Sequence, residues 1–271
     1  MSNQNFKEKV VIITGGGGTL GGSMAEAFAE AGAHLVLLGR RIEVLEQQRK
    51  LLLDKSEVEI LCLPCDVTDK QQLITAREEI LDRFNSIDIL INAAGGNLKG
   101  ATIGPDQTFL DLEIPDFEKV TDLNLMGTLL PCMVFGEVMA EQKRGAILNI
   151  SSMAADRVIT RVIGYSASKA AVENLTRSLA VELAKKFGDG LRVNALAPGF
   201  FIAEQNKSLL IDENGKYTQR GKTIIENTPM NRFGRKEEIQ GAALFLCSEQ
   251  ASFITGTVLE VDGGFSAFSG V

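Results

Sequence analysis

Short, almost uninterrupted apolar runs alternate with longer segments of helical spacing from one end of this chain to the other. Such runs are typical of strands that are covered on both faces in a parallel sheet. The expected strands are residues 10–14, 34–38, 58–65, 87–92, 146–151, 191–195 and 257–261. The expected helices are residues 20–31, 42–53, 69–84, 116–141, 164–187 and 236–247. This order predicts an α/β fold: one doubly wound domain, residues 1–271, with a mostly parallel seven-stranded sheet.

The composition is that of an ordinary globular domain, with 45% hydrophobic and 23% charged residues. A formal net charge of −7 argues against a nucleic acid or an anionic membrane surface as partner. No apolar run approaches the roughly 20 residues of a membrane span, and the first residues lack a secretory signal pattern. We therefore expect a cytoplasmic protein with reduced thiols.

Two of the four cysteines, Cys62 and Cys65, have the C-x-x-C spacing of redox and metal sites. They have no second pair, and His34 is the only histidine of the sequence. Both lie in the expected strand 58–65, so we interpret them as structural residues and expect no metal site.

Two irregular segments, residues 95–115 and 200–229, each follow the carboxyl end of an expected strand. Ligands bind at this edge in open α/β sheets, and long insertions there are usually functional. Residues 200–229 are the expected helical lid over a substrate.

A glycine-rich turn, residues 15–22, joins the first expected strand to the first helix. Such a turn lets backbone amides approach a pyrophosphate, and the helix N-terminus adds partial positive charge. Asp66, just past the third strand, could hydrogen-bond an adenine amino group. The small residues 93–95 could let the backbone lie close to a dinucleotide.

The second expected strand ends at Arg40 and Arg41, where no acidic residue is present. An acidic residue at this tip would bind the ribose 2′-hydroxyl of NAD, whereas an arginine accommodates the 2′-phosphate of NADP. The charge favours NADP. Arg40 could instead stack on adenine, which leaves NAD open.

Tyr165 and Lys169 are separated by four residues on an expected helix, so they share one face, one turn apart. A phenol with its ordinary pKa of about 10 is a poor acid–base catalyst at neutral pH. A cation one turn away stabilises the phenolate and lowers that pKa. The pair predicts proton transfer to or from a substrate oxygen.

Together these features resemble the short-chain dehydrogenase/reductase family across essentially the full length, which implies a Rossmann fold and NAD(P)-dependent reduction of a carbonyl group. One departure is Thr19, which stands where the family's glycine-rich motif has its middle glycine. The motifs that carry the resemblance are Thr14-Gly15…Gly21, Asp66-Val67, Asn92-Ala93-Ala94-Gly95, Asn124, Ser151-Ser152, Tyr165…Lys169, Pro198-Gly199 and Val261-Asp262-Gly263-Gly264.

The resemblance implies roles for four catalytic residues. Tyr165 would exchange the proton, Ser152 would hydrogen-bond the substrate oxygen, Lys169 would lower the Tyr165 pKa and bind the nicotinamide ribose, and Asn124 would support a proton-relay water. The hydroxyl pair would replace a polarising metal. The implied cofactor contacts are Gly15, Gly17, Gly18, Thr19, Leu20, Gly21, Arg40, Asp66, Val67, Asn92, Ala93, Ala94, Gly95, Tyr165, Lys169, Pro198, Gly199 and Phe201.

Four stretches, residues 96–112, 127–131, 200–206 and 263–271, resemble the D-mannonate oxidoreductase (fructuronate reductase) branch of the family. That branch interconverts D-fructuronate and D-mannonate. A pocket rimmed by amides, a carboxylate and cations suits a hydroxylated, anionic ligand better than an acyl chain. The expected substrate contacts are Asn97, Arg157, Arg161 and Gln205.

The alternatives are a reductase of another carbonyl substrate, such as a 3-oxoacyl thioester or a different keto sugar, and a nucleotide-sensing protein without chemistry. Ala203 departs from a threonine that contacts the nicotinamide carboxamide in many members. The usual assembly of the family, with the apolar chain end 265–271, implies a homotetramer.

Overall fold

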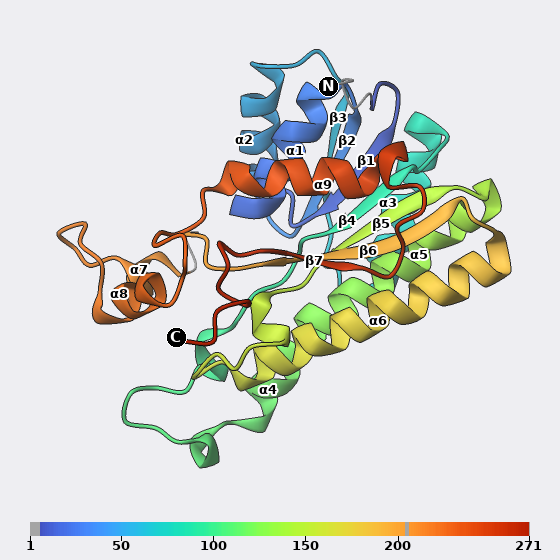
Figure 1. Cartoon of the computed structure of the whole chain (residues 1–271). Helices are drawn as coiled ribbons and strands as arrows, with labels where there is room; N and C mark the ends of the chain where they lie inside the picture. Colours follow the sequence, from blue (N-terminus) through green and yellow to red (C-terminus); the bar gives the residue numbers. More distant parts are fainter. Residues whose placement is uncertain (1–5, 204–205, 271) are drawn as a thin grey trace.

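The computed structural model describes residues 6–203 and 206–270 (Figure 1). A twisted seven-stranded sheet crosses the molecule in the order β3-β2-β1-β4-β5-β6-β7. Every neighbouring pair is parallel, so the expected fold is confirmed and the sheet is parallel throughout. The strands are β1 Val10–Thr14, β2 His34–Gly39, β3 Ile60–Pro64, β4 Ile89–Asn92, β5 Gly145–Ile150, β6 Leu191–Pro198 and β7 Val258–Val261.

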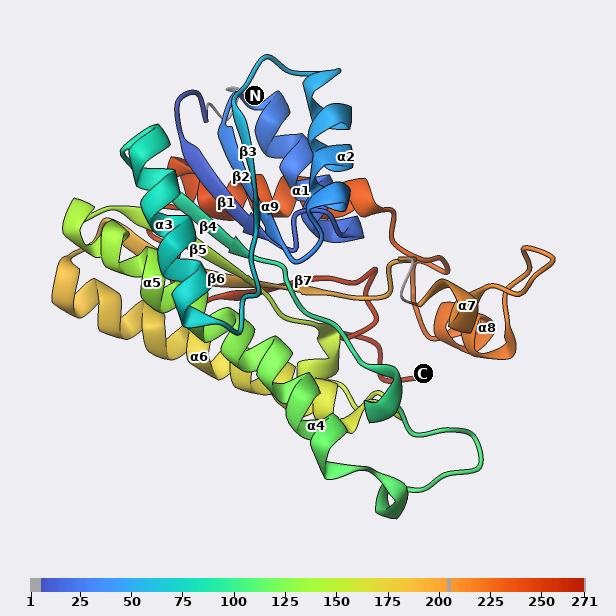
Figure 2. The ribbon, with the colours of Figure 1, turned by 180° about the vertical axis from the view of Figure 1, so that it is seen from behind.

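Helices cover both faces of the sheet, as Figures 1 and 2 show from opposite sides. Helices α1 (Thr19–Glu30), α2 (Ile42–Leu53) and α9 (Gln240–Cys247) lie on one face, and α3 (Lys70–Phe84), α5 (Gly127–Gln142) and α6 (Ile163–Phe187) on the other. Each face has its own apolar core, one around Phe28 and one around Phe135. All five residues of β1 are buried, which explains its unbroken apolar run.

The strand order reverses between β2 and β4, which both pair with β1. In open α/β sheets, ligands bind outside the carboxyl ends of the strands at such a switch point. The glycine-rich turn and residues 93–96 follow β1 and β4 at this edge. The topology therefore brings together segments that are far apart in the sequence.

One continuous helix, residues 114–142, consists of α4 (Ile114–Thr121), a π-helical turn η3 (Asp122–Met126) and α5. It is long and apolar enough to cross a membrane by length and composition, so the expectation that no segment approaches a span was wrong by this measure. Burial accounts for its character, because 56% of its most apolar window lies inside the protein.

Both irregular segments project beyond the sheet (Figures 1 and 2). In the first segment, residues 95–113 contain only the short turns η1 (Lys99–Ala101) and η2 (Phe109–Asp111), and α4 begins at its end. The expected lid is helical: it contains α7 (Lys207–Leu210) and α8 (Gln219–Glu226), whose bounds we had not predicted. Leu210 and Ile224 of the lid are buried with Phe233, which follows it, in a small apolar cluster of their own.

Cys62 and Cys65 pack into different cores, Cys62 against the cluster around Phe28 and Cys65 within the cluster around Phe135. They therefore lie on opposite faces of the sheet. Burial raises the pKa of Cys62 to about 12 and that of Cys65 to about 11. This arrangement supports the structural interpretation of the C-x-x-C pair, because neither thiol is poised to ionise near neutral pH.

Candidate active site

Ser152, Tyr165 and Lys169 are brought together where β5 ends. Ser152 caps the short turn after β5, with its Oγ accepting a hydrogen bond from the Ala154 amide at 3.2 Å. Helix α6 begins at Ile163, which places Tyr165 in its first turn and Lys169 one turn later. The Lys169 Nζ lies 5.7 Å from the centre of the Tyr165 ring, and the Ser152 and Tyr165 side chains share a hydrogen bond.

The electrostatics of this trio differ from the expectation. Burial raises the pKa of Tyr165, and the hydrogen bond with Ser152 only partly opposes that effect. Burial also lowers the pKa of Lys169 to about 8, while its ammonium donates to the Ile150 carbonyl at 2.7 Å. In the chain without its cofactor, desolvation of the phenolate therefore sets the direction of the Tyr165 pKa shift.

Asn124 lies in the π-helical turn η3 and is fully buried. Its Nδ2 donates to the carbonyls of Gly96 at 2.8 Å and Val120 at 2.7 Å, and its Oδ1 accepts from the Gly96 amide at 3.0 Å. A Cβ added to Gly95 would lie 2.7 Å from the Asn124 Oδ1 and 3.3 Å from the Lys169 Nζ. Asn124 thus fixes the backbone after β4 beside the catalytic lysine.

The glycine-rich turn fits a dinucleotide. Gly15 has a φ of +66°, and a Cβ there would lie 2.9 Å from the Ala94 amide nitrogen. The Thr14 hydroxyl accepts hydrogen bonds from the Ala93 and Ala94 amides at 3.1 and 3.0 Å, which ties the ends of β1 and β4 together. Helix α1 begins without a side-chain cap or an acidic residue in its first turn. Its amides are therefore available to an anion such as a pyrophosphate.

The other expected cofactor residues also lie near this edge. The Asp66 Oδ1 accepts from the Thr68 amide at 2.9 Å and hydroxyl at 2.7 Å, so this carboxylate shapes its own turn. Arg40 and Arg41 are exposed, and neither makes a salt bridge to a described residue. Gly199 approaches Asp262 so closely that a Cβ would lie 2.6 Å from the Asp262 Cα.

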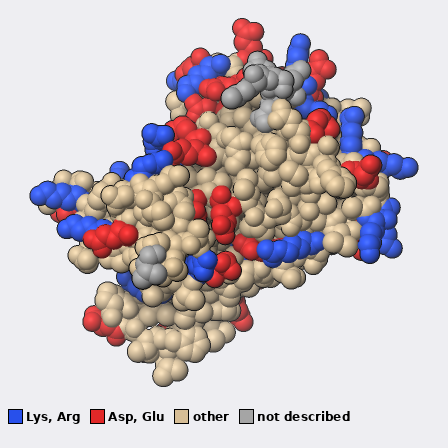
Figure 3. All heavy atoms as spheres, viewed as in Figure 1, with Lys and Arg blue, Asp and Glu red and all other residues tan. Residues whose placement is uncertain are grey.

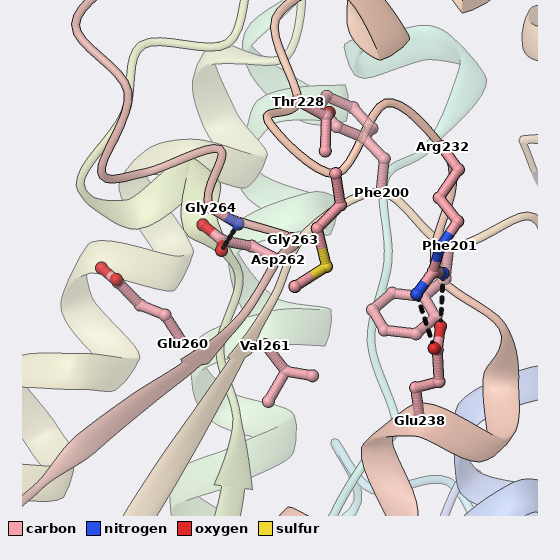
Figure 4. Close-up of a pocket in the computed structure, with 12 residues that line it drawn as sticks. Phe200, Phe201, Thr228, Arg232, Glu238, Glu260, Val261, Asp262, Gly263 and Gly264 are labelled. Atoms are coloured by element: carbon pink, nitrogen blue, oxygen red, sulfur yellow. Dashed lines mark hydrogen bonds and ion pairs between the residues drawn. The ribbon is translucent and has the colours of Figure 1, made fainter.

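A cavity of 390 Å³ lies between the base of the lid and the end of β7 (Figure 4). Phe201, Arg232, Glu238 and Asp262 are among its lining residues, whereas the catalytic trio is not. The Phe201 ring packs on Gly234: a Cβ added to Gly234 would lie 2.6 Å from a carbon of that ring. The expected contact between Phe201 and the cofactor stays a prediction.

The four expected substrate residues have different surroundings. Asn97 donates to the Thr102 hydroxyl at 2.5 Å, and its buried Oδ1 has no partner among the described residues. Arg157 donates to the Ser266 carbonyl and lies 3.5 Å from the Asp156 carboxylate. The Arg161 Nε donates to the Ile103 carbonyl at 2.6 Å. Gln205 lies outside the described residues.

Sequence reasoning missed a buried polar chain behind the site. The Asn92 Nδ2 donates to the Asn149 Oδ1 at 2.9 Å, and the Asn149 Nδ2 donates to the Thr176 hydroxyl at 2.9 Å. This chain links β4, β5 and α6, the three elements that position the catalytic residues. The signal was present in the sequence as polar residues inside apolar strands, which need partners when buried.

A family model described as enoyl-(acyl carrier protein) reductase matches residues 18–266, nearly the whole chain. The chain belongs to the short-chain dehydrogenase/reductase family. Among curated members, it is 40% identical to an uncharacterised oxidoreductase, UxuB, of Bacillus subtilis, with 99% of each chain covered. It is 35% identical to levodione reductase of Leifsonia aquatica, with 97% of this chain and 96% of that protein covered.

A crystal structure of a candidate D-mannonate oxidoreductase from Haemophilus influenzae, with bound NAD, superposes with a TM-score of 0.92. The two chains are 41% identical over 99% of each. Family membership makes this chain an NAD(P)-dependent short-chain oxidoreductase that acts on CH–OH groups.

Proposed function

We propose that this short-chain dehydrogenase/reductase interconverts a keto sugar acid and its alcohol, with D-fructuronate and D-mannonate as the pair. The observation that carries the proposal is the 41% identity, over 99% of each chain, to the candidate D-mannonate oxidoreductase. Two expected substrate residues support the proposal. Asn97 carries an amide and Arg161 a guanidinium, and both lie on segments that flank the catalytic residues. Such groups suit a hydroxylated carboxylate better than an acyl chain.

The chain's own residues would manage the proton and the substrate oxygen. The bound nicotinamide cofactor supplies the hydride to C5 of the ketone, or accepts it from C5 of the alcohol. Tyr165 would give its phenolic proton to the substrate oxygen during reduction and take it back during oxidation. Ser152, already hydrogen-bonded to Tyr165, would orient that oxygen, and Asn124 would hold the backbone beside Lys169.

For the cofactor, we propose that the chain accepts NAD, as its solved relative does, and that Arg40 and Arg41 let it accept NADP as well. Both arginines are exposed at the end of β2, where a 2′-phosphate is recognised in this fold. Replacing both with alanine should raise the KM for NADP and leave that for NAD nearly unchanged. An equal rise for both cofactors would contradict this role.

We also propose a homotetramer and a cytoplasmic location. Helices α5 and α6 expose apolar side chains, including Met133 at 50% and Val181 at 56%. Apolar residues gathered on one helix pair are typical of a subunit contact.

A substrate panel tests the proposed function. Purified protein would be assayed with several hexuronates, neutral ketoses and a 3-oxoacyl thioester, each with NADH and with NADPH. We expect D-fructuronate to have the highest kcat/KM. A higher value for the thioester or for a neutral ketose would overturn the proposal and favour another branch of the family.

A further inference from the structure

Arg161 and Arg220 are two half-buried guanidinium groups that lack an acidic partner. Arg161 lies in the loop that leads into α6, and Arg220 lies in the lid helix α8. Neither forms a salt bridge with any described residue. By contrast, Arg232, also in the lid region, holds Glu238 through two contacts of 2.7 Å. Arg161 and Arg220 therefore differ from Arg232, whose charge is already balanced by a carboxylate.

Arg161 is held in place by its own backbone and by Ile103. The Ile103 amide donates to the Arg161 carbonyl at 3.0 Å, and the Arg161 Nε donates to the Ile103 carbonyl at 2.6 Å. Its φ of +77° is rare for a residue with a side chain, so the surrounding contacts hold this backbone in place. These bonds use one guanidinium N–H and leave the terminal nitrogens free of described partners, four residues before Tyr165.

Arg220 lies on the lid within range of the Arg161 charge. Burial lowers the pKa of Arg220, and the positive charge of Arg161 lowers it further, so the two cations lie close enough to repel each other. The lid helices and the loop that leads into α6 lie at the same end of the sheet (Figure 1). Two cations without an acidic partner at this end, one on the lid and one on the loop that leads into α6, suit an anion.

We propose that Arg161 and Arg220 together bind the carboxylate of the substrate, Arg161 from the loop that leads into α6 and Arg220 from the lid helix α8. This inference rests on the proposed sugar-acid substrate. It adds Arg220 as a substrate contact and couples the charge of the substrate to the position of the lid. The bound carboxylate bridges the lid to the loop that leads into α6. An anionic substrate therefore favours the closed lid, whereas a neutral polyol does not. Arg157 has no such role, because its guanidinium is engaged by Ser266 and Asp156.

The test compares an acid with its neutral counterpart in oxidation. The variants Arg161→Gln, Arg220→Gln and Lys222→Gln would be assayed with D-mannonate, D-mannitol and D-mannitol 1-phosphate. Loss of one charge-assisted bond should lower kcat/KM for D-mannonate roughly 10- to 100-fold and barely change the value for D-mannitol. Lys222→Gln is the matched control, because Lys222 is an exposed cation on the same helix.

The outcomes separate this site from the proposed function. If wild type oxidises D-mannonate but Arg220→Gln changes both alcohols equally, the two-arginine site is wrong and the proposed function stands. If wild type oxidises another sugar acid instead, the same variants on that acid and its neutral alcohol decide the site. A preference of wild type for the phosphate or for neutral alcohols alone would overturn the carboxylate site.

Thermal unfolding gives a second readout that separates binding from structure. Because Arg220 and Arg161 repel each other in the free chain, Arg220→Gln should leave the Tm unchanged or raise it. D-mannonate should stabilise wild type more than it stabilises this variant. A clear fall in Tm without ligand would assign Arg220 a structural role and contradict the proposal.

Discussion

Lys169 is a buried cation without an acidic partner among the described residues, and it is held by the Ile150 carbonyl. Burial of such a charge destabilises the fold unless the group loses its proton. The same burial gives the active site a lysine with a pKa near 8. At the scale of single residues, burial of Lys169 thus lowers the stability of the fold and also gives the catalytic centre an amine that titrates near physiological pH.

Replacing Lys169 with methionine should change how stability depends on pH. The unfolded chain keeps the proton of Lys169 up to its ordinary pKa of 10.5, whereas the folded chain releases it near 8. Unfolded chains therefore bind more protons between these values, and wild-type stability rises with pH. Relative to Lys169→Met, wild type should gain about 2 kcal/mol from pH 8 to about pH 9.5. Denaturant unfolding would measure this, and parallel pH profiles would contradict the assignment.

Replacing Tyr165 with phenylalanine should lower kcat by roughly 10²- to 10⁴-fold, because the group that exchanges the proton is lost. Cofactor affinity, measured by fluorescence of the reduced nicotinamide, should persist. The matched control is Tyr217→Phe, since Tyr217 lies in the lid and its ring packs edge-on against Phe233. Equal losses in the two variants would remove the catalytic role of Tyr165.

At the scale of elements, the sequence predicted all seven described strands, and burial on both faces explains the unbroken apolar runs of central strands such as β1. The π-helical turn in the long helix 114–142 was not predictable. It places Asn124 against Gly96, a partner that only the tertiary fold brings near. The bounds of the lid helices were not predicted, since their apolar residues are buried only in a small cluster of their own. Arg220 was missed because only the fold brings the lid and the loop before α6 to the same end of the sheet.

The lid should loosen independently of the sheet. Ile224 is 7% exposed within the lid cluster, and Ile224→Ala would leave a cavity there. Hydrogen exchange should speed up in α7 and α8 while β1 and β4 stay protected. The control is Leu209→Ala, because Leu209 is 45% exposed. Equal acceleration in the central strands would show that the lid and the sheet unfold together.

At the scale of the whole molecule, acidic and basic side chains are interspersed on the face in Figure 3, and much of the surface over α9 carries no charge. Helices α5 and α6 on the opposite side of the sheet expose Met133 and Val181. Surfaces of this kind allow identical chains to associate through twofold contacts.

Light scattering should give a mass near four times the 29.3 kDa of one chain. Val181→Glu should lower that mass, because it places a charge in the proposed contact. Leu51→Glu, at a residue 60% exposed on α2, should not. A monomeric wild type at micromolar concentration would contradict the assembly.

The proposed reduction forms one new bond to carbon, the C–H bond at C5 of a keto sugar acid. The most direct measurement is the reduction of D-fructuronate with NADH that carries deuterium at the transferable position, followed by NMR of the product. We predict D-mannonate with deuterium at C5, and none with Tyr165→Phe over the same period. No labelled product from wild type, or a label at another carbon, would contradict the account.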